Sequence, residues 1–222
     1  MMIEGRLSLL TFPGFVGGLL TVFFALLPML SWWLGHPTLC LWFSLIGLPL
    51  LEMAFQNYRG PLPYWSFWSL RVLLFLMAVQ AIVGAFVLAT YSWWILILGA
   101  IGSGYCAGGS GNALGHELGH SLQRWDRFLA KSFFTSVCFG HYTQEHAGSH
   151  HVVVGTPKDS LYTEVTDTLT VFMFRNMKRQ FQNAVEVAKR RNNLWAEVYG
   201  PLVVYGLINV VVAEWVGFKG VV

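Results

Sequence analysis

Five of the seven histidines in this chain fall in two short segments. The first is HELGH at residues 116–120, and the second is EHAGSHH at residues 145–151. A neutral imidazole is the commonest nitrogen ligand for zinc, iron, copper and nickel. So many imidazoles at such short spacing therefore predict metal binding, and their number favours more than one ion.

The spacing within each segment places imidazoles together. On a helix, His116 and His120 lie one turn apart on the same face, as do His146 and His150. His151 adds a third imidazole beside the second pair. Alone, HELGH is also typical of zinc metalloproteases, in which the Glu is the general base, but a catalytic zinc needs only three protein ligands. Nitrogen ligands without a thiolate suit two non-haem irons, and manganese or copper is the alternative metal.

Neighbouring side chains are candidates for supporting the ligands. Glu117 and Glu145 each adjoin a predicted ligand, and a carboxylate that accepts an imidazole N–H fixes the tautomer and orientation of the ring. His141 is expected to hydrogen-bond to a ligand or to be structural, with direct ligation as the alternative. His36 lies in a predicted turn and is expected to take no part.

The composition predicts an integral membrane protein, because 55% of the residues are hydrophobic and 11% are charged. A spanning helix needs roughly 20 apolar residues. The first apolar run is too long, and lacks the small-residue cleavage site, for a signal peptide. We expect an all-α polytopic bundle forming a single domain over residues 1–222, with about five transmembrane spans. These are expected at about 8–34, 37–55, 69–90, 92–114 and 198–218.

Lys and Arg residues give this bundle an orientation. In the expected topology only Lys219 lies opposite the other basic residues, and the positive-inside rule makes the more basic side cytoplasmic. Both histidine segments then face the cytoplasm, within a histidine-rich helical cap at about residues 115–197. Inside the cap, apolar residues recur every three or four positions from Phe174 to Ala188. They predict an amphipathic helix that covers the cytoplasmic mouth or lies on the lipid headgroups.

Small residues predict close helix packing just before the first histidine segment. Ala100, Gly104 and Gly108 follow one another at four-residue steps, which in membrane helices permits close approach. The alternative is a narrow route for an apolar ligand.

The motifs together resemble the membrane-bound alkane monooxygenases, within the wider group of histidine-rich membrane desaturases and hydroxylases. The resemblance runs from NALGHELGH at residues 112–120 through GHY at 140–142 and EHAGSHH to TPKD at 156–159, which is similar to the family's Thr-Pro-Glu-Asp. Asp167 stands where the family usually has Glu. The three-residue gap between His146 and His150 favours this family over the fatty acid desaturases, which usually have a two-residue gap.

The resemblance implies a di-iron hydroxylase that inserts one oxygen atom of O2 into the terminal C–H bond of a medium-chain alkane. Electrons would come from a rubredoxin that an NADH-dependent reductase reduces. The chain would lie in the bacterial inner membrane and take its apolar substrate from the bilayer. Glu117, Glu145, His141 and Asp167 would be the supporting residues. The implied iron ligands are His116, His120, His146, His150 and His151.

Some features of the family are missing. Its later Asn-Tyr-x-Glu-His-Tyr-Gly segment and further histidine-rich box do not occur, and Ser121 replaces the basic residue usual after the first box. We therefore expect the chain to correspond to the N-terminal portion of such an enzyme, incomplete alone. Alternatives are a fatty-acyl or xylene-type hydroxylase or desaturase, an intramembrane zinc protease of the HExxH type, and a membrane protein that has lost catalysis. Substrate chain length and oligomeric state stay open.

Overall fold

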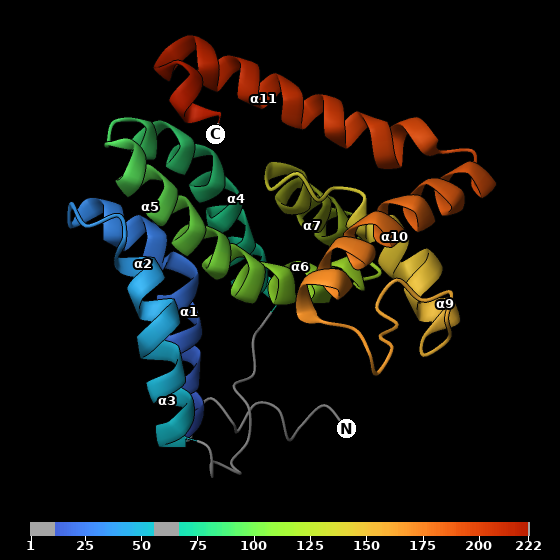
Figure 1. Ribbon diagram of the computed structural model, residues 1–222, viewed down its shortest axis with the longest axis horizontal. Coiled ribbons are helices and arrows are strands. Elements are labelled where there is room, and N and C mark those ends of the chain that lie inside the picture. The colour runs from blue at the N-terminus through green and yellow to red at the C-terminus, as the bar shows by residue number, and fades with distance from the viewer. Residues whose placement is uncertain (1–11, 56–66, 222) are drawn as a thin grey trace.

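The computed structural model describes residues 12–55 and 67–221, and these residues form helices and no strand. Figure 1 shows the longer helices packed around one another, with α11 running along one side of the molecule. The all-α prediction is confirmed for the described part of the chain. The longest helices are α1 (Phe12–Trp33), α4 (Phe67–Ala89), α5 (Trp93–Cys106), α10 (Leu169–Arg190) and α11 (Gly200–Val216).

The five predicted spans are helical over most of the length that the structure describes, and only residues near their ends, such as Pro37, Thr38 and Ser92, are not helical. The first begins before the described residues and continues as α1. Each of the other four spans corresponds to one helix or to consecutive helical elements. These are α2 (Leu39–Trp42), η3 (Phe43–Gly47) and α3 (Leu48–Phe55); α4; α5 with η4 (Ala107–Gly111) and α6 (Asn112–Gly119); and η6 (Trp195–Tyr199) with α11.

Two of the described helices are long and apolar enough to cross a membrane. They are Trp68–Ala89, which is most of α4, and Trp195–Val216, which joins η6 to α11. Their far ends meet, because Lys219 in η7 (Phe218–Gly220) donates to the carbonyl oxygen of Tyr91 at 3.0 Å. The two candidate spans therefore run in the same direction. The other three spans stay predictions.

The predicted ridge of Ala100, Gly104 and Gly108 is wrong. A Cβ added at Gly104 or Gly108 would meet nothing within 4 Å, whereas one at Gly102 would lie 2.4 Å from the backbone nitrogen of Leu41. The close approach uses a different side of α5 because α2 packs there. A four-residue spacing shows which small residues share a face of the helix, but it does not show which face meets the neighbouring helix.

Helix α7 (Arg124–Ser136) packs against α4 and α6 and fixes the helix that carries the first histidine segment. Phe133 and Phe134 are 1% and 2% exposed and belong to the main apolar core together with Leu74 of α4. A Cβ at Gly111 would lie 2.2 Å from Phe133, and one at Gly115 would lie 2.8 Å from Phe134. Glycine at these two positions allows the end of η4 and the middle of α6 to lie directly on the aromatic rings.

The predicted amphipathic helix is confirmed as α10, but only part of its predicted face is covered. Ala184 and Ala188 are buried, whereas Phe174 and Met177 are exposed. The covered half packs against α8 (Tyr142–Glu145) and η5 (His146–His150), which precede α9 (His151–Val153).

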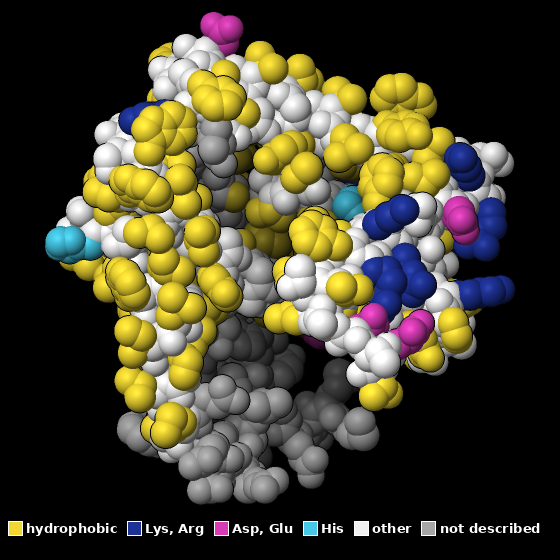
Figure 2. Space-filling model, in the orientation of Figure 1, with side chains coloured by type: hydrophobic (Ala, Val, Ile, Leu, Met, Phe, Trp, Pro, Cys, Tyr) yellow, Lys and Arg dark blue, Asp and Glu magenta, His cyan; other side chains and the backbone are white. Residues whose placement is uncertain are grey.

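Figure 2 shows apolar side chains over α1 to α5 and α11, with Lys and Arg gathered over α10. On this face of the molecule, the apolar side chains and most of the charged side chains therefore occupy different parts of the surface.

Candidate metal centre

The first histidine segment ends helix α6. His116 lies in the last turn of the helix and His120 is its C-terminal cap. Their Nε2 atoms are 3.2 Å apart, as the predicted one-turn spacing requires. The contact between Gly115 and Phe134 holds this turn against α7.

The second segment does not form the expected α-helical turn. Residues 146–150 form a π-helix, in which hydrogen bonds join residues five apart. His146 is therefore paired with His151, their Nε2 atoms lying 3.0 Å apart. The ring of His150 lies alongside that of His146, with centroids 5.3 Å apart and planes 24° apart.

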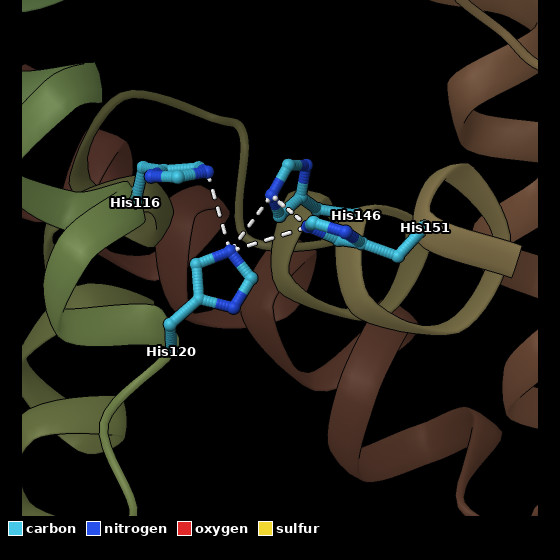
Figure 3. Close-up of side chains that lie close together, drawn as sticks. All are labelled: His116, His120, His146 and His151. Carbon is cyan, nitrogen blue, oxygen red and sulfur yellow. Dashed lines mark hydrogen bonds between the residues drawn. The ribbon is translucent and has the colours of Figure 1, made fainter. Parts of the chain in front are cut away.

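Four imidazoles from the two segments converge on one point (Figure 3). Nε2 of His120 lies 3.1 Å from that of His146 and 3.3 Å from that of His151. One ligand atom from each of the four residues lies within 4.8 Å of the others. We call this group the histidine cluster; its members are His116, His120, His146 and His151.

The donor set fits a metal ion. Metal–nitrogen bonds of about 2.0–2.1 Å place neighbouring ligand nitrogens roughly 2.8–3.0 Å apart in octahedral geometry and roughly 3.3–3.4 Å apart in tetrahedral geometry. The cluster's contacts of 3.0–3.3 Å lie within this range. Burial, reinforced by the neighbouring imidazoles, lowers the pKa of His146 to about 4. The same causes lower the pKa of His120. Both rings are therefore neutral at pH 7, as ligation requires.

The fifth predicted ligand, His150, is held by a carboxylate. Its Nδ1 lies 2.8 Å from Oδ1 of Asp159, which is 3% exposed and also accepts from the backbone amides of Gly155 and Leu161. Burial would raise the pKa of Asp159, but these hydrogen bonds outweigh it and lower that pKa. An ionised Asp159 makes Nδ1 the protonated nitrogen, so Nε2 keeps its lone pair for a metal. Sequence reasoning gave Asp159 no role, and TPKD was the only signal for it.

The predicted supporting residues lie in different surroundings. Glu145 is 1% exposed and accepts from Ser160 Oγ at 2.8 Å, and burial raises its pKa. Glu117 has an Oε1 atom 3.5 Å from Nδ1 of His116 and a side chain that is 67% exposed. Asp167 binds Arg175 and the amide of Glu164 instead of a histidine.

His141 is outside the histidine cluster. Its ring packs edge-on against Phe139 and Phe181, with centroids 4.9 and 5.3 Å away. Neither of its ring nitrogens has a hydrogen-bond partner, and burial lowers its pKa. The surroundings favour the structural interpretation of this residue over direct ligation.

A half-open cavity of about 240 Å³ lies between α4, α5 and α11. Leu96, Gly104 and Val212 contribute apolar walls, while Gln80 and Asn209 contribute polar ones. Its lining includes Ala107 of η4, which leads directly into α6. The cavity therefore reaches the residues that lead into α6, and its lining includes no residue of either histidine segment.

Comparisons with known proteins agree with this geometry. The profile of the family described as Fatty acid desaturase matches residues 91–220, which include both histidine segments. An alkane 1-monooxygenase of Pseudomonas putida is 27% identical over 90% of this chain and 56% of its own length. An alkane 1-monooxygenase of Ectopseudomonas oleovorans is 26% identical over 86% of this chain and 54% of its own length. Alkane 1-monooxygenase 1 of Alcanivorax borkumensis is 27% identical over 78% of this chain and 47% of its own length. The chain thus spans about half the length of these relatives. The resemblance inferred from the motifs is confirmed.

Proposed function

Because this chain belongs to the fatty acid desaturase family, we propose that it forms the histidine-rich part of a non-haem di-iron monooxygenase that hydroxylates the terminal carbon of alkanes. The observation that carries the proposal is the convergence of four imidazole nitrogens from two separate segments. The names of the curated relatives support the reaction and the substrate class. A metalloprotease would use HELGH alone, and the convergence of both segments argues against that alternative.

The proposed setting is the bacterial inner membrane, with about five spans and the histidine cluster on the cytoplasmic side. The two long apolar helices support a membrane location. The basic surface over α10 supports the orientation, since Lys and Arg are enriched on cytoplasmic faces. A cytoplasmic cluster would be accessible to rubredoxin, which we propose as the electron donor and which an NADH-dependent reductase would reduce.

The proposed iron ligands are the histidine cluster and His150. The cluster offers donors for one ion. His150 is the candidate for a second ion, because Asp159 occupies its Nδ1 and leaves Nε2 available. Glu117 and Glu145 are proposed to support the ligands.

When bound, two iron ions would supply the O2 activation that protein side chains lack. The chain's own contribution is to position the ligands, of which His120 and His151 are exposed. The ring of Tyr142 stacks on His146, with centroids 5.0 Å apart and planes 19° apart, and so covers one side of the cluster. The cavity between α4, α5 and α11 is proposed to admit the alkane from the bilayer.

Metal content per chain tests the proposal. The protein is purified in detergent, reconstituted with ferrous iron and measured by elemental analysis beside His120→Ala and His146→Ala. His36→Ala is the matched control, because His36 is exposed and lies outside the cluster. We expect iron approaching two per chain, lost in the two cluster variants and kept in the control. Negligible iron, or one zinc per chain, would contradict the proposal.

Activity is measured separately. The reconstituted protein is supplied with O2, reduced rubredoxin and octane, and 1-octanol is quantified. Formation of 1-octanol that His120→Ala abolishes would support hydroxylation by this chain. Iron binding without product would restrict the proposal to metal binding by this chain alone.

A further inference from the structure

Helix α7 is attached to the first turns of both candidate membrane spans. Near its start, Oδ1 of Asp126 lies 2.5 Å from Nε of Arg71. Arg71 is three residues after the start of the candidate span Trp68–Ala89, which is called the first span below. Further along, Nζ of Lys131 donates to Oε2 of Glu197 at 2.8 Å, two residues after the second span begins at Trp195. Helix α7 therefore bridges the level at which both spans begin.

This level corresponds to one surface of the membrane. The two spans run in the same direction, because the contact between Lys219 and Tyr91 joins their other ends. A helix that bridges two parallel spans at their starts lies across them and at the bilayer boundary. It is placed where lipid headgroups would be.

The outer face of this region is apolar and aromatic. Leu122, Trp125 and Phe128 are 94%, 75% and 58% exposed and follow one another at three-residue steps. The rings of Trp125 and Phe128 contact each other edge-on, with centroids 5.8 Å apart. Trp68, at the start of the first span, is 72% exposed and adds a second tryptophan at this level. Tryptophan is enriched at membrane interfaces, where one part of the ring is apolar and the N–H meets water.

The charges beside this face have one sign. Arg124 and Arg127 are exposed. Asp126, the one acidic residue of α7, is 0% exposed and binds Arg71 and Ser121 Oγ. The outer face of α7 is therefore cationic and aromatic, which complements the phosphates and acyl boundary of anionic lipids.

We propose that the outer face of α7, formed by Trp125 and Phe128 with Arg124 and Arg127, rests in the headgroup layer of anionic phospholipids together with Leu122, which lies just before the helix. The occupant of this face is the lipid surface, and the contact fixes the depth of the first histidine segment. The link is short: Ser121 follows His120 directly and donates to the buried Asp126 at 2.5 Å. This inference rests on the membrane location proposed above.

Fluorescent labels on α7 test the inference. In the full chain carrying Cys138→Ser, Trp125→Cys or Phe128→Cys receives an environment-sensitive label, while Cys40 and Cys106 stay buried. Val165→Cys is the matched control, because Val165 is fully exposed and lies outside α7. The proteins are reconstituted in vesicles of phosphatidylcholine, with or without phosphatidylglycerol. Lipids carrying a nitroxide at the headgroup or deep in the acyl chain serve as quenchers.

We expect blue-shifted emission and at least twofold stronger quenching by the headgroup nitroxide at positions 125 and 128 than at 165. Phosphatidylglycerol should strengthen this quenching, and Arg124→Gln with Arg127→Gln should remove the gain. Labels at 125 and 128 that stay water-exposed in vesicle-bound protein would overturn the inference. A blue shift that depends on protein concentration would overturn it in favour of a second copy of the chain. Protein that fails to float with the vesicles would instead contradict the membrane location itself.

Discussion

Nε2 of His120 lies 3.1 Å from Nε2 of His146, although 26 residues separate them in the chain. The contact joins the end of α6 to the start of η5, two elements held in place by different neighbours. Phe134 of α7 supports the first, and α10 supports the second, where a Cβ at Gly148 would lie 2.5 Å from Val187. The geometry of the metal centre therefore depends on the relative position of α7 and α10.

Removing the central imidazole should strongly weaken metal binding. His120 contacts each of the other three members of the histidine cluster through Nε2. We expect His120→Ala to weaken metal affinity by more than about 100-fold, since changes to residues that only orient ligands already cost about 10–100-fold. Competition with a chromogenic chelator measures the affinity. Equal affinity in His120→Ala and His36→Ala would show that the cluster does not bind the metal.

Two aspartates should differ in their effect on the metal. Asp159→Asn removes the carboxylate that orients His150, so we expect metal affinity to fall about 10–100-fold. Asp167→Asn breaks a contact with Arg175 and should leave the affinity unchanged. The same chelator competition, with circular dichroism to confirm folding, compares them. The reverse order of effects would restore the role that the sequence suggested for Asp167.

Substitution by alanine should have different effects on stability at two glycines of α6. At Gly115 the new Cβ would lie 2.8 Å from Phe134, so we expect Gly115→Ala to destabilise the fold by about 1–3 kcal/mol through overpacking. At Gly119 nothing lies within 4 Å, so Gly119→Ala should be neutral or slightly stabilising, by up to about 1 kcal/mol. Thermal unfolding in detergent measures both. Similar Tm values for the two variants would contradict the close packing of α6 on α7.

Acid should weaken the attachment between α4 and α7. Hydrogen bonding from Arg71 lowers the pKa of Asp126 below its ordinary value of 3.8. A carboxyl group with a lowered folded-state pKa stabilises the protein above its unfolded pKa, and this contribution is lost as pH falls through the folded pKa. We expect Asp126→Asn to destabilise the protein at pH 7, because it leaves Arg71 without its charged partner. Denaturant unfolding at pH 7 and pH 3 gives the free energy of unfolding of Asp126→Asn and of the wild type. The difference between the two proteins should be smaller at pH 3 than at pH 7. An equal difference at both pH values would contradict this prediction.

Much of the fold follows from one-dimensional patterns. The apolar runs predict helices because a long apolar segment satisfies its backbone hydrogen bonds internally only as a helix in lipid. The pair of His116 and His120 also follows, since α6 is a regular helix and four residues make one turn. The four-residue spacing of His146 and His150 predicts the wrong partner, because the local turn is a π-helix.

Other features depend on contacts that no periodicity encodes. The hydrogen bond between His150 and Asp159 requires the turn around Gly155, whose φ is +75°. The exposure of Phe174 depends on which part of α10 meets α8 and η5, and the apolar period alone predicts burial along the whole face. Likewise, the open sides of Gly104 and Gly108 reflect where α2 lies.

The π-helical turn also explains how a motif length can change while a ligand position is retained. His146 reaches His151 across five residues in a π-helix, and a regular α-helix makes the same closure across four. Deleting Ala147 or Ser149 and relaxing the turn to an α-helix would keep the second of the paired histidines facing His120. The π-helix thus accommodates one more residue than a regular α-helix would between the same two donors, so a turn shorter by one residue is compatible with this arrangement of imidazoles.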